Sequence, residues 1–391
     1  MKPLAITAFT TANPLGLGNA ATLAALRERR GGLRPHTDVN LETFVGRVEG
    51  LDTPIGGALA PYDCRNNRLA LLGLAQDGFE QRVARAREKY GAGRIAVILG
   101  TTTSGIAATE RAYAERNAAN DRLPRWFRYR ETHNVFSASD FVRRRLGVAG
   151  PAAAISTACS SSAKVFASAQ RLIEAGYVDA AVVGGVDSLC LTTLYGFKSL
   201  QLLSRDACRP CDLQRDGISI GEAAGFALLE GREGESRVAL LGYGETSDAY
   251  HMSTPHPQGD GAVAAIRAAL GRAQLEPGDI DYVNMHGTGT RSNDASEDMA
   301  LARVFDSAVP CSSTKGWTGH TLGAAGVLEA IFSLLSIQYG FIPGSLNLRQ
   351  VDPALKSAIA IEPQQRRVRC VLSNSFGFGG SNCSLVFGEL R

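Results

Sequence analysis

The same alternation of predicted strands and helices occurs twice in this chain of 391 residues. Short apolar or β-branched runs alternate with longer segments of helical spacing, and the alternation starts again after a polar stretch at 231–237. The strand-like runs are 4–9, 94–100, 152–158 and 179–186 in the first part, and 238–244, 279–287, 309–316 and 367–377 in the second. This alternation predicts an α/β fold with buried strands. We therefore expect two similar α/β halves, residues 1–234 and 235–391, packed back to back.

Composition and charge exclude several classes of function. The 41 Lys and Arg residues against 38 Asp and Glu leave a formal net charge of +3, so a global electrostatic grip on nucleic acid is not expected. The opening residues predict a strand and a Pro-Gly turn, not a secretion signal. The longest apolar helix candidate, residues 327–337, contains Glu329 and is shorter than a bilayer requires. Eight scattered cysteines favour reduced thiols, and we expect a cytoplasmic protein without a membrane span.

Cys159 lies in the motif STACSSS, between a predicted strand and a predicted helix. A thiol at such a turn meets the positive end of the helix dipole and unpaired backbone N–H groups, which favour the thiolate and bind an oxyanion. An arbitrary cysteine is more often a small core residue. The small neighbours leave room for a substrate, and this favours a nucleophile.

Two histidines occupy comparable turns in the second half. His286 opens HGTGT after a strand-like run, and His320 closes KGWTGH ahead of a long helix. A single histidine is usually a structural hydrogen-bonding group. Two histidines and a cysteine in glycine-rich turns after core strands form the kind of set that nucleophilic catalysis uses.

Two further motifs are weaker evidence for a functional site. Cys208 and Cys211 form a CxxC, but no second pair or nearby histidine pair completes a zinc set, so packing is favoured. The glycines of SNSFGFGGSN, residues 373–382, allow a backbone that folds closely over a ligand. No Lys-Ser/Thr follows them, as a phosphate loop requires. We expect neither a metal site nor a nucleotide site.

Four motifs together resemble those of the β-ketoacyl-acyl-carrier-protein synthases. They are STACSSS with Cys159, HGTGT with His286, STKGWTGHTLGAAG with Lys315 and His320, and SNSFGFGGSN with Phe378. Their order and separations fit that family over essentially the whole chain. The second half is most similar to synthases I and II of bacterial fatty acid synthesis. TACSSS with HGTGT is also common in polyketide ketosynthases, including type II and aryl polyene systems, so the pathway stays open.

The resemblance implies a thiolase-like fold, with two pseudo-repeated α/β halves in an αβαβα arrangement, and usually a dimer. It also implies a decarboxylative Claisen condensation. Cys159 would hold the acyl chain as a thioester, while His286 and His320 polarise the malonyl thioester carbonyl as carbon dioxide leaves. Imidazole N–H donors suit this step because negative charge builds on the enolate oxygen. The substrates would arrive on the phosphopantetheine of an acyl carrier protein, and no metal or organic cofactor is implied.

The resemblance also assigns supporting roles. Lys315 and Glu329 would form a buried charge pair that orients the histidines. Asp294 and Glu297 would brace the site. The backbone N–H groups of Cys159 and Phe378 would bind the tetrahedral oxygen during acyl transfer. The residues assigned to gating or to contact with the substrate are Phe378, Phe197, Gly379, Thr288 and Thr290.

Carrier proteins of this kind are acidic, so a local basic surface is expected. The candidate docking residues are Arg65, Arg68, Arg125 and Arg205. Two segments depart from the family pattern. The loop 202–212 is shorter than in the fatty acid enzymes, and residues 116–134 diverge where the family builds its dimer interface and acyl tunnel. The length of the acyl chain therefore does not follow from the resemblance.

Three alternative functions would use a related fold. A thiolase would share the fold but needs a second catalytic cysteine, and Cys383 lies inside a strand-like run. A chain-length factor generally lacks the nucleophile, and Cys159 is present. The third alternative is the catalytic subunit of a heterodimeric specialised system, which stays open beside a homodimeric enzyme.

Overall fold

The computed structural model describes residues 1–36, 41–231, 236–305 and 309–390. Twelve strands in these ranges form one mixed sheet, in the order β14-β12-β11-β16-β17-β10-β1-β9-β7-β5-β6 with β2 beside β1. These strands are β1 (Leu4–Asn13), β2 (Gly16–Leu17), β5 (Ile95–Gly100), β6 (Ala152–Ile155), β7 (Ala180–Asp187), β9 (Ala223–Glu230), β10 (Val238–Ser247), β11 (Tyr282–Asn284), β12 (Pro310–Ser312), β14 (Ala358–Ile359), β16 (Cys370–Gly377) and β17 (Ser381–Glu389).

Smaller elements complete the fold. The short strands are β3 (Leu33–Pro35), β4 (Phe44–Gly46), β8 (Ile220–Gly221), β13 (Phe341–Ile342) and β15 (Gln364–Gln365). The helices are α1 (Gly18–Arg27), α2 (Arg65–Leu74), α3 (Phe79–Tyr90), α4 (Ile106–Ala114), α5 (Ser137–Leu146), α6 (Ser161–Glu174), α7 (Leu191–Ser199), α8 (Asp260–Ala273), α9 (Arg291–Phe305), α10 (Lys315–Thr318) and α11 (Ala325–Tyr339). The single turns are η1 (Gly57–Tyr62), η2 (Ala92–Arg94), η3 (Tyr129–His133), η4 (Pro277–Asp279), η5 (Leu322–Ala324) and η6 (Phe378–Gly380).

The two halves of the sheet have the same topology. In the first half β6, β5 and β7 are parallel, and β9 pairs antiparallel with β7 on one side and with β1 on the other. In the second half β12, β11 and β16 are parallel, and β17 and β10 continue in the same way. Strands β1 and β10 pair where the halves meet. The expected α/β fold is thus confirmed, whereas the expected boundary at 234/235 lies outside the described residues.

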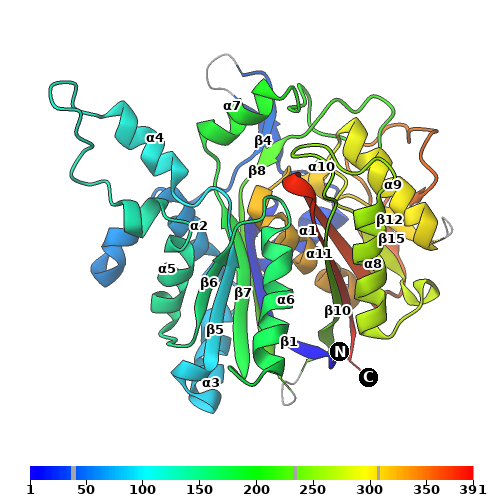
Figure 1. Ribbon diagram of the computed structural model, residues 1–391, viewed down its shortest axis with the longest axis horizontal. Helices are drawn as coiled ribbons and strands as arrows, with labels where there is room; N and C mark the ends of the chain where they lie inside the picture. Colours follow the sequence, from blue (N-terminus) through cyan, green and yellow to red (C-terminus); the bar gives the residue numbers. More distant parts are fainter. Residues whose placement is uncertain (37–40, 232–235, 306–308, 391) are drawn as a thin grey trace.

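Two long helices form the middle layer. Helix α6 packs on strands of both halves, and α11 does the same from the other half. Figure 1 shows α6 between the first-half strands and β10, with α5 and α3 on one side of the molecule and α8 and α9 on the other. The two middle helices cross at Gly326, where an added Cβ would lie 2.5 Å from the backbone nitrogen of Ala163. Only a glycine allows this approach.

Helix α11 with its preceding turn is long and apolar enough to cross a membrane, with a mean hydropathy of 1.4 over residues 322–339. The expectation that this segment is too short was wrong, because it extends five residues further toward the N-terminus. However, 89% of the segment is buried inside the protein. Its apolar character is therefore that of a core helix.

The fold brings the predicted motifs to one region. Cys159 lies directly before the helical turn that begins α6, and His320 lies before η5 and α11, the counterparts in the second half. His286 follows β11, and Phe378 follows β16. The carboxyl ends of neighbouring parallel strands lie at the same edge of a sheet, and ligand sites form there.

Candidate active site

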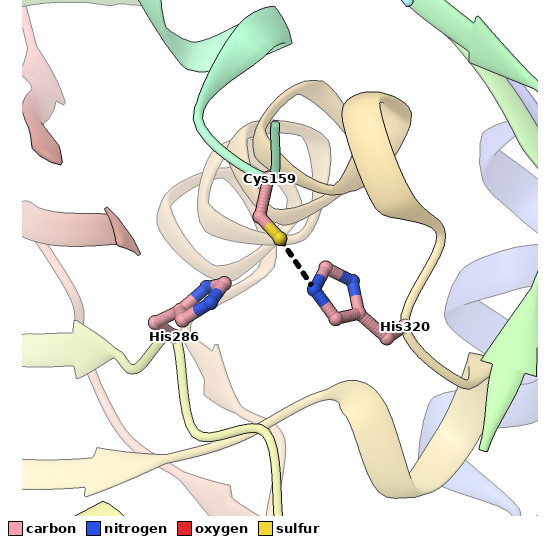
Figure 2. A group of neighbouring side chains, drawn as sticks. All are labelled: Cys159, His286 and His320. Atoms are coloured by element: carbon pink, nitrogen blue, oxygen red, sulfur yellow. Dashed lines mark hydrogen bonds between the residues drawn. The ribbon is translucent and has the colours of Figure 1, made fainter. Parts of the chain in front are cut away.

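Three side chains from three turns meet at the centre of the molecule. The Cys159 sulfur lies 3.0 Å from Nε2 of His320, and the rings of His286 and His320 have centroids 5.4 Å apart. Figure 2 shows both imidazoles facing the sulfur. All three side chains are buried, with 7% or less of each residue exposed. These are the three residues that the sequence motifs predicted as one set.

A strained turn presents Cys159. Ala158 has a φ of +52°, a left-handed conformation that is uncommon for residues other than glycine. The Ser161 hydroxyl accepts a hydrogen bond from the Thr157 N–H at 2.9 Å and stabilises this turn. The thiolate at rest that was expected here is not supported. Burial raises the pKa of the Cys159 thiol to about 11, against the smaller lowering effects of Lys315 and of the backbone N–H groups of Phe378 and Cys159.

The backbone around His320 fixes its ring. The His320 N–H donates to the Ser219 carbonyl at 2.7 Å, and the Gly221 N–H donates to the His320 carbonyl at 3.0 Å. The Leu322 N–H donates to Nδ1 of His320 at 3.2 Å. A neutral imidazole that accepts at Nδ1 carries its proton on Nε2, the atom that faces Cys159. Burial, and then the charge of Lys315, holds the pKa of His320 well below 6.5.

Lys315 plays the matching part for His286. Its Nζ lies 3.4 Å from Nδ1 of His286, and it also donates to the His286 carbonyl and to Glu329. An ammonium group can only donate, so the His286 proton is on Nε2. Burial, followed by the charge of Lys315, lowers the pKa of His286 well below 6.5. Burial also raises the pKa of Glu329 to about 7, against the opposing effect of Lys315.

Two buried carboxylates hold the HGTGT turn. Glu297 accepts the N–H groups of His286 and Gly287 at 2.9 and 2.7 Å, and burial raises its pKa to about 7. Asp294 accepts the Gly289 N–H at 3.2 Å and lies 3.4 Å from Arg215 Nε, and burial raises its pKa. Both side chains thus lie behind the site and contact backbone groups of the turn.

A pocket leads from the surface to Cys159. The residues that were expected to gate it or to contact substrate, Phe378, Phe197, Gly379, Thr288 and Thr290, all line it. The rings of Phe197 and Phe378 have centroids 5.8 Å apart, and the hydroxyls of Thr288 and Thr290 are 2.9 Å apart. The pocket wall is mainly apolar, and its polar lining residues include Asp248, Asn293 and Asn382 besides those of the HGTGT turn.

Comparison with known families identifies this arrangement. Residues 67–234 match the family described as "Beta-ketoacyl synthase, N-terminal domain", and residues 238–349 match the corresponding C-terminal domain. The chain belongs to the β-ketoacyl synthase family. The expected fold and the assignment as an acyltransferase that forms carbon–carbon bonds are thereby confirmed.

Individual relatives agree with the family. The 3-oxoacyl-[acyl-carrier-protein] synthase 2 of Rhizobium meliloti is 31% identical over 99% of this chain and 98% of its own. The mitochondrial synthase of Arabidopsis thaliana is 40% identical over 66% of this chain, and the match spans 60% of its length. Among solved structures, a ketosynthase (ApeO) in complex with its chain length factor (ApeC), from Xenorhabdus doucetiae, has a TM-score of 0.92. It is 38% identical and covers 100% of this chain and 98% of that chain.

The arginines expected to dock a carrier protein fall into two groups in this synthase. Arg65 is bound to the buried Glu222 through two nitrogens, and Arg68 is bound to Asp63 in the same way. Both are therefore engaged within the chain. Arg125 and Arg205 are exposed.

Several residues at the synthase pocket carried no sequence signal. Asp248 lines it and accepts hydrogen bonds from Asn382 Nδ2 at 2.7 Å and from the His256 N–H at 3.1 Å. Arg215, which contacts Asp294, was missed as well. These are single polar residues in loops without a motif. The only available indication was the position of Asp248 directly after the buried strand β10, and Arg215, between α7 and β8, had none.

The donor atoms of Cys159, His286 and His320 lie within 4.8 Å of one another, a set of the type that zinc accepts. The ammonium of Lys315, 3.4 Å from His286, adds positive charge that opposes a dication there. The CxxC thiols, Cys208 and Cys211, are buried and not joined in a disulfide. The Cys208 thiol donates to the Lys315 carbonyl at 3.2 Å, which supports a packing role.

Proposed function

We propose that this synthase condenses malonyl units, decarboxylatively, with an acyl chain held as a thioester on Cys159. The observation that carries the proposal is the position of the Cys159 sulfur, 3.0 Å from Nε2 of His320 and facing His286. Both substrates arrive on the phosphopantetheine of an acyl carrier protein in the cytoplasm. The chemistry assigned below uses side chains and backbone groups, and no metal or organic cofactor takes part in it.

The first step is acyl transfer to Cys159. The sulfur attacks the carbonyl carbon of the incoming thioester, and the pantetheine sulfur leaves as the thiol with the proton that Cys159 gives up. Negative charge develops on the carbonyl oxygen, and the N–H groups of Cys159 and Phe378 are directed at this region. Because the resting thiol has a pKa of about 11, its proton leaves during the attack and not before it.

The second step breaks the bond between the carboxylate carbon and the methylene carbon of the malonyl group. The electron pair of that bond forms an enolate, carbon dioxide leaves, and the enolate carbon attacks the acyl carbonyl on Cys159. The C–S bond of the acyl-enzyme then breaks, and the Cys159 sulfur leaves as a thiolate that regains its proton from solvent. The enolate oxygen is stabilised by two N–H donors, Nε2 of His286 and Nε2 of His320. Their low pKa values keep both imidazoles neutral at physiological pH, and Lys315 and the Leu322 N–H fix both protons on Nε2.

The same pocket accommodates the carrier arm. The Thr288 and Thr290 hydroxyls bind the amides of phosphopantetheine, and Phe378 gates passage to the sulfur with Phe197 and Gly379 beside it. Arg125 and Arg205 dock the acidic carrier protein, while the supporting residues Asp294, Glu297 and Glu329 hold the turns.

A second candidate function is the catalytic subunit of a two-component system. It is favoured by the full-length likeness to the ketosynthase that was solved with a chain length factor. In the described part of the chain β6 has no neighbour on one side, and such an edge can pair with another strand. Nearby, α4 and the segment after it project from the body (Figure 1), and Tyr113, Tyr129 and Phe136 are exposed there. A ketosynthase-like partner would cover these groups.

Mass spectrometry of the intact protein and its peptides tests the main proposal. After incubation with acyl-carrier thioesters of short saturated, long saturated and polyene chains, we expect an adduct on Cys159 and none in Cys159→Ala. Condensation with malonyl carrier in the Cys159→Ala variant would refute the mechanism. For the second candidate, activity is compared for the chain alone and mixed with a ketosynthase-like subunit. Full activity of the chain alone, as a homodimer, would exclude a required partner.

A further inference from the structure

Asp187 is a buried carboxylate that the proposed reaction does not use. It ends β7, and β7 is parallel to β5, whose last residue is followed by Thr101, Thr102 and Thr103. Because the two strands end side by side, the carboxylate lies against this run of three threonines. Asp187 is completely buried. Its position in the first half corresponds to the strand end that carries the Phe378 loop in the second half.

Neutral hydrogen-bond donors surround both oxygens of Asp187. Oδ1 accepts the Thr101 hydroxyl at 2.6 Å and the N–H groups of Thr102 and Thr103 at 2.9 Å each, along with the Thr103 hydroxyl at 3.0 Å. Oδ2 accepts the Thr102 hydroxyl at 2.5 Å and the Gly323 N–H at 2.6 Å. A buried carboxylate is stable only when such donors surround it. One of them, Gly323, belongs to the other half of the protein.

Gly323 lies in the turn that fixes the His320 ring. The preceding residue, Leu322, has a φ of +55°, which is strained for a leucine, and its N–H is the donor to Nδ1 of His320. A Cβ on Gly323 would lie 2.8 Å from Oδ2 of Asp187, so the turn and the carboxylate are in direct contact. The hydrogen bond from Gly323 to Asp187 therefore holds the strained Leu322 N–H under the imidazole.

We propose that Asp187 is a positioning residue that keeps the His320 proton on Nε2 by holding the Leu322–Gly323 turn. The inference rests on the proposed role of His320 as an N–H donor. With the turn released, Nδ1 would lose its donor and the imidazole could carry the proton on Nδ1 instead. Nε2 would then present its lone pair to the Cys159 sulfur, so the thiol would donate its proton to Nε2 as a hydrogen bond, and the thiolate would lose the N–H donor that faces it in the unmodified protein.

The titratable groups that face the pair of Cys159 and His320 come from three other elements. They are His286 after β11, Lys315 in α10 and Glu329 in α11. They are unchanged in the variants below, so a change in the titration of Cys159 reports on the turn.

The test is alkylation of Cys159 by iodoacetamide in the full-length protein, followed by peptide mass spectrometry as a function of pH. Asp187→Asn is the main variant. Oδ1 accepts more hydrogen bonds than Oδ2, so the asparagine should keep its oxygen on the Oδ1 side and place its NH₂ group on the Oδ2 side. The NH₂ group would then face the Gly323 N–H, and two donors without an acceptor would repel each other. We expect the alkylation profile to move to higher pH by about one unit, or roughly tenfold slower alkylation at neutral pH, because the thiolate loses one hydrogen-bond donor.

Asp140→Asn is the matched control, because Asp140 is another largely buried carboxylate of the first half, held by Tyr62, Arg143 and Arg144. Its profile should match that of the unmodified protein. Gly323→Ala is the second variant, because its Cβ pushes the turn away from Asp187, and it should shift the profile in the same direction even where Asp187→Asn does not fold. An unchanged profile in a folded variant of either kind overturns the proposal.

The outcomes separate this proposal from the proposed function. Alkylation needs neither malonyl nor carrier substrates, so the shift can be observed even if condensation fails. Decarboxylation adds an independent readout. Asp187→Asn should lower kcat for malonyl decarboxylation about tenfold with KM for the malonyl carrier unchanged, because the lost Nε2 donor acts in the transition state. Equal changes in kcat and KM would contradict the positioning role of Asp187.

Discussion

The Nζ of Lys315 lies 3.4 Å from Nδ1 of His286 and at the same time holds Glu329 on the central helix α11. One ammonium group thus joins the turn after β11 to the middle layer of the fold. On the other side of the site a backbone amide, that of Leu322, does for His320 what the ammonium does for His286. Two different donors produce the same tautomer, and both Nε2–H groups are available to one oxygen.

Removing either imidazole should separate the two chemical steps. His286→Ala or His320→Ala should lower decarboxylation of malonyl carrier by about 10²–10³-fold, the usual cost of one oxyanion donor in a buried site. Acylation of Cys159 should persist, because the proposed acyl transfer uses backbone N–H groups to bind its oxyanion. Carbon dioxide release and the mass of the acyl-enzyme measure the two steps separately. Equal loss of both steps would refute the assigned roles.

Glu297 should make the stability of the protein depend on pH. Burial raises its pKa from 4.5 to about 7, so between these values the unfolded chain releases a proton that the folded chain keeps. The unfolded state therefore binds fewer protons, and stability falls as pH rises through this window. We expect the Tm to fall between about pH 5 and 7.5, and Glu297→Gln to flatten part of that slope. Glu329, whose pKa is also about 7, supplies the remainder. Parallel curves for both proteins would contradict the prediction.

The sequence was sufficient to predict the architecture and the three side chains that meet in the candidate site, because both depend on local patterns. Strand periodicity located β5, β7, β10 and β16, and small residues around Cys159 indicated a turn open to substrate. Strand ends were less accurate. The run 309–316 forms a strand only at β12, because α10 begins at Lys315. Strand β9 was missed, since a short and wholly buried apolar run has no alternation to distinguish it from a helix.

Properties that depend on distant parts of the chain could not be predicted. The helix dipole favours a thiolate at Cys159, and this led to the expectation of a low pKa. Burial instead raises the pKa of the thiol, and the depth of that burial depends on both halves of the protein. Arg65 and Arg68 resemble free docking residues in sequence, whereas each is bound to a carboxylate. Asp187 belongs to no motif, and its donors come from two other segments. Pairing of this kind is a property of the tertiary structure.

Gly379 should be sensitive to a single methyl group for conformational reasons alone. Its φ is +78°, and an added Cβ would meet nothing within 4 Å. Gly379→Ala should therefore cost about 1–2 kcal/mol through backbone strain and slow acylation by displacing the Phe378 loop. Gly271→Ala is the matched control, since its Cβ is equally unobstructed but lies in helix α8, where alanine is favoured by about 1 kcal/mol. Urea unfolding of both variants measures the difference, and equal stabilities would contradict the argument.

The pair of Lys315 and Glu329 should separate stability from catalysis. Both side chains are buried, with 2% and 4% of their surface exposed. Lys315→Met leaves the Glu329 carboxylate without its cation, and Glu329→Met leaves the ammonium without its anion. Each single variant should lose about 3–5 kcal/mol of unfolding free energy. The double variant removes both charges and keeps the volume, so its stability should return to within about 1 kcal/mol of the unmodified protein.

Catalysis should not recover with stability in the double variant. Nδ1 of His286 has lost its donor there, so the proton is no longer confined to Nε2 and the enolate oxygen loses one fixed N–H. Decarboxylation should stay at least tenfold below that of the unmodified protein, while acylation of Cys159 continues. Urea unfolding and carbon dioxide release from the same preparations measure both quantities. A stable double variant that decarboxylates at the original rate would show that Lys315 acts only in folding, and the assignment of the His286 tautomer would have to be abandoned.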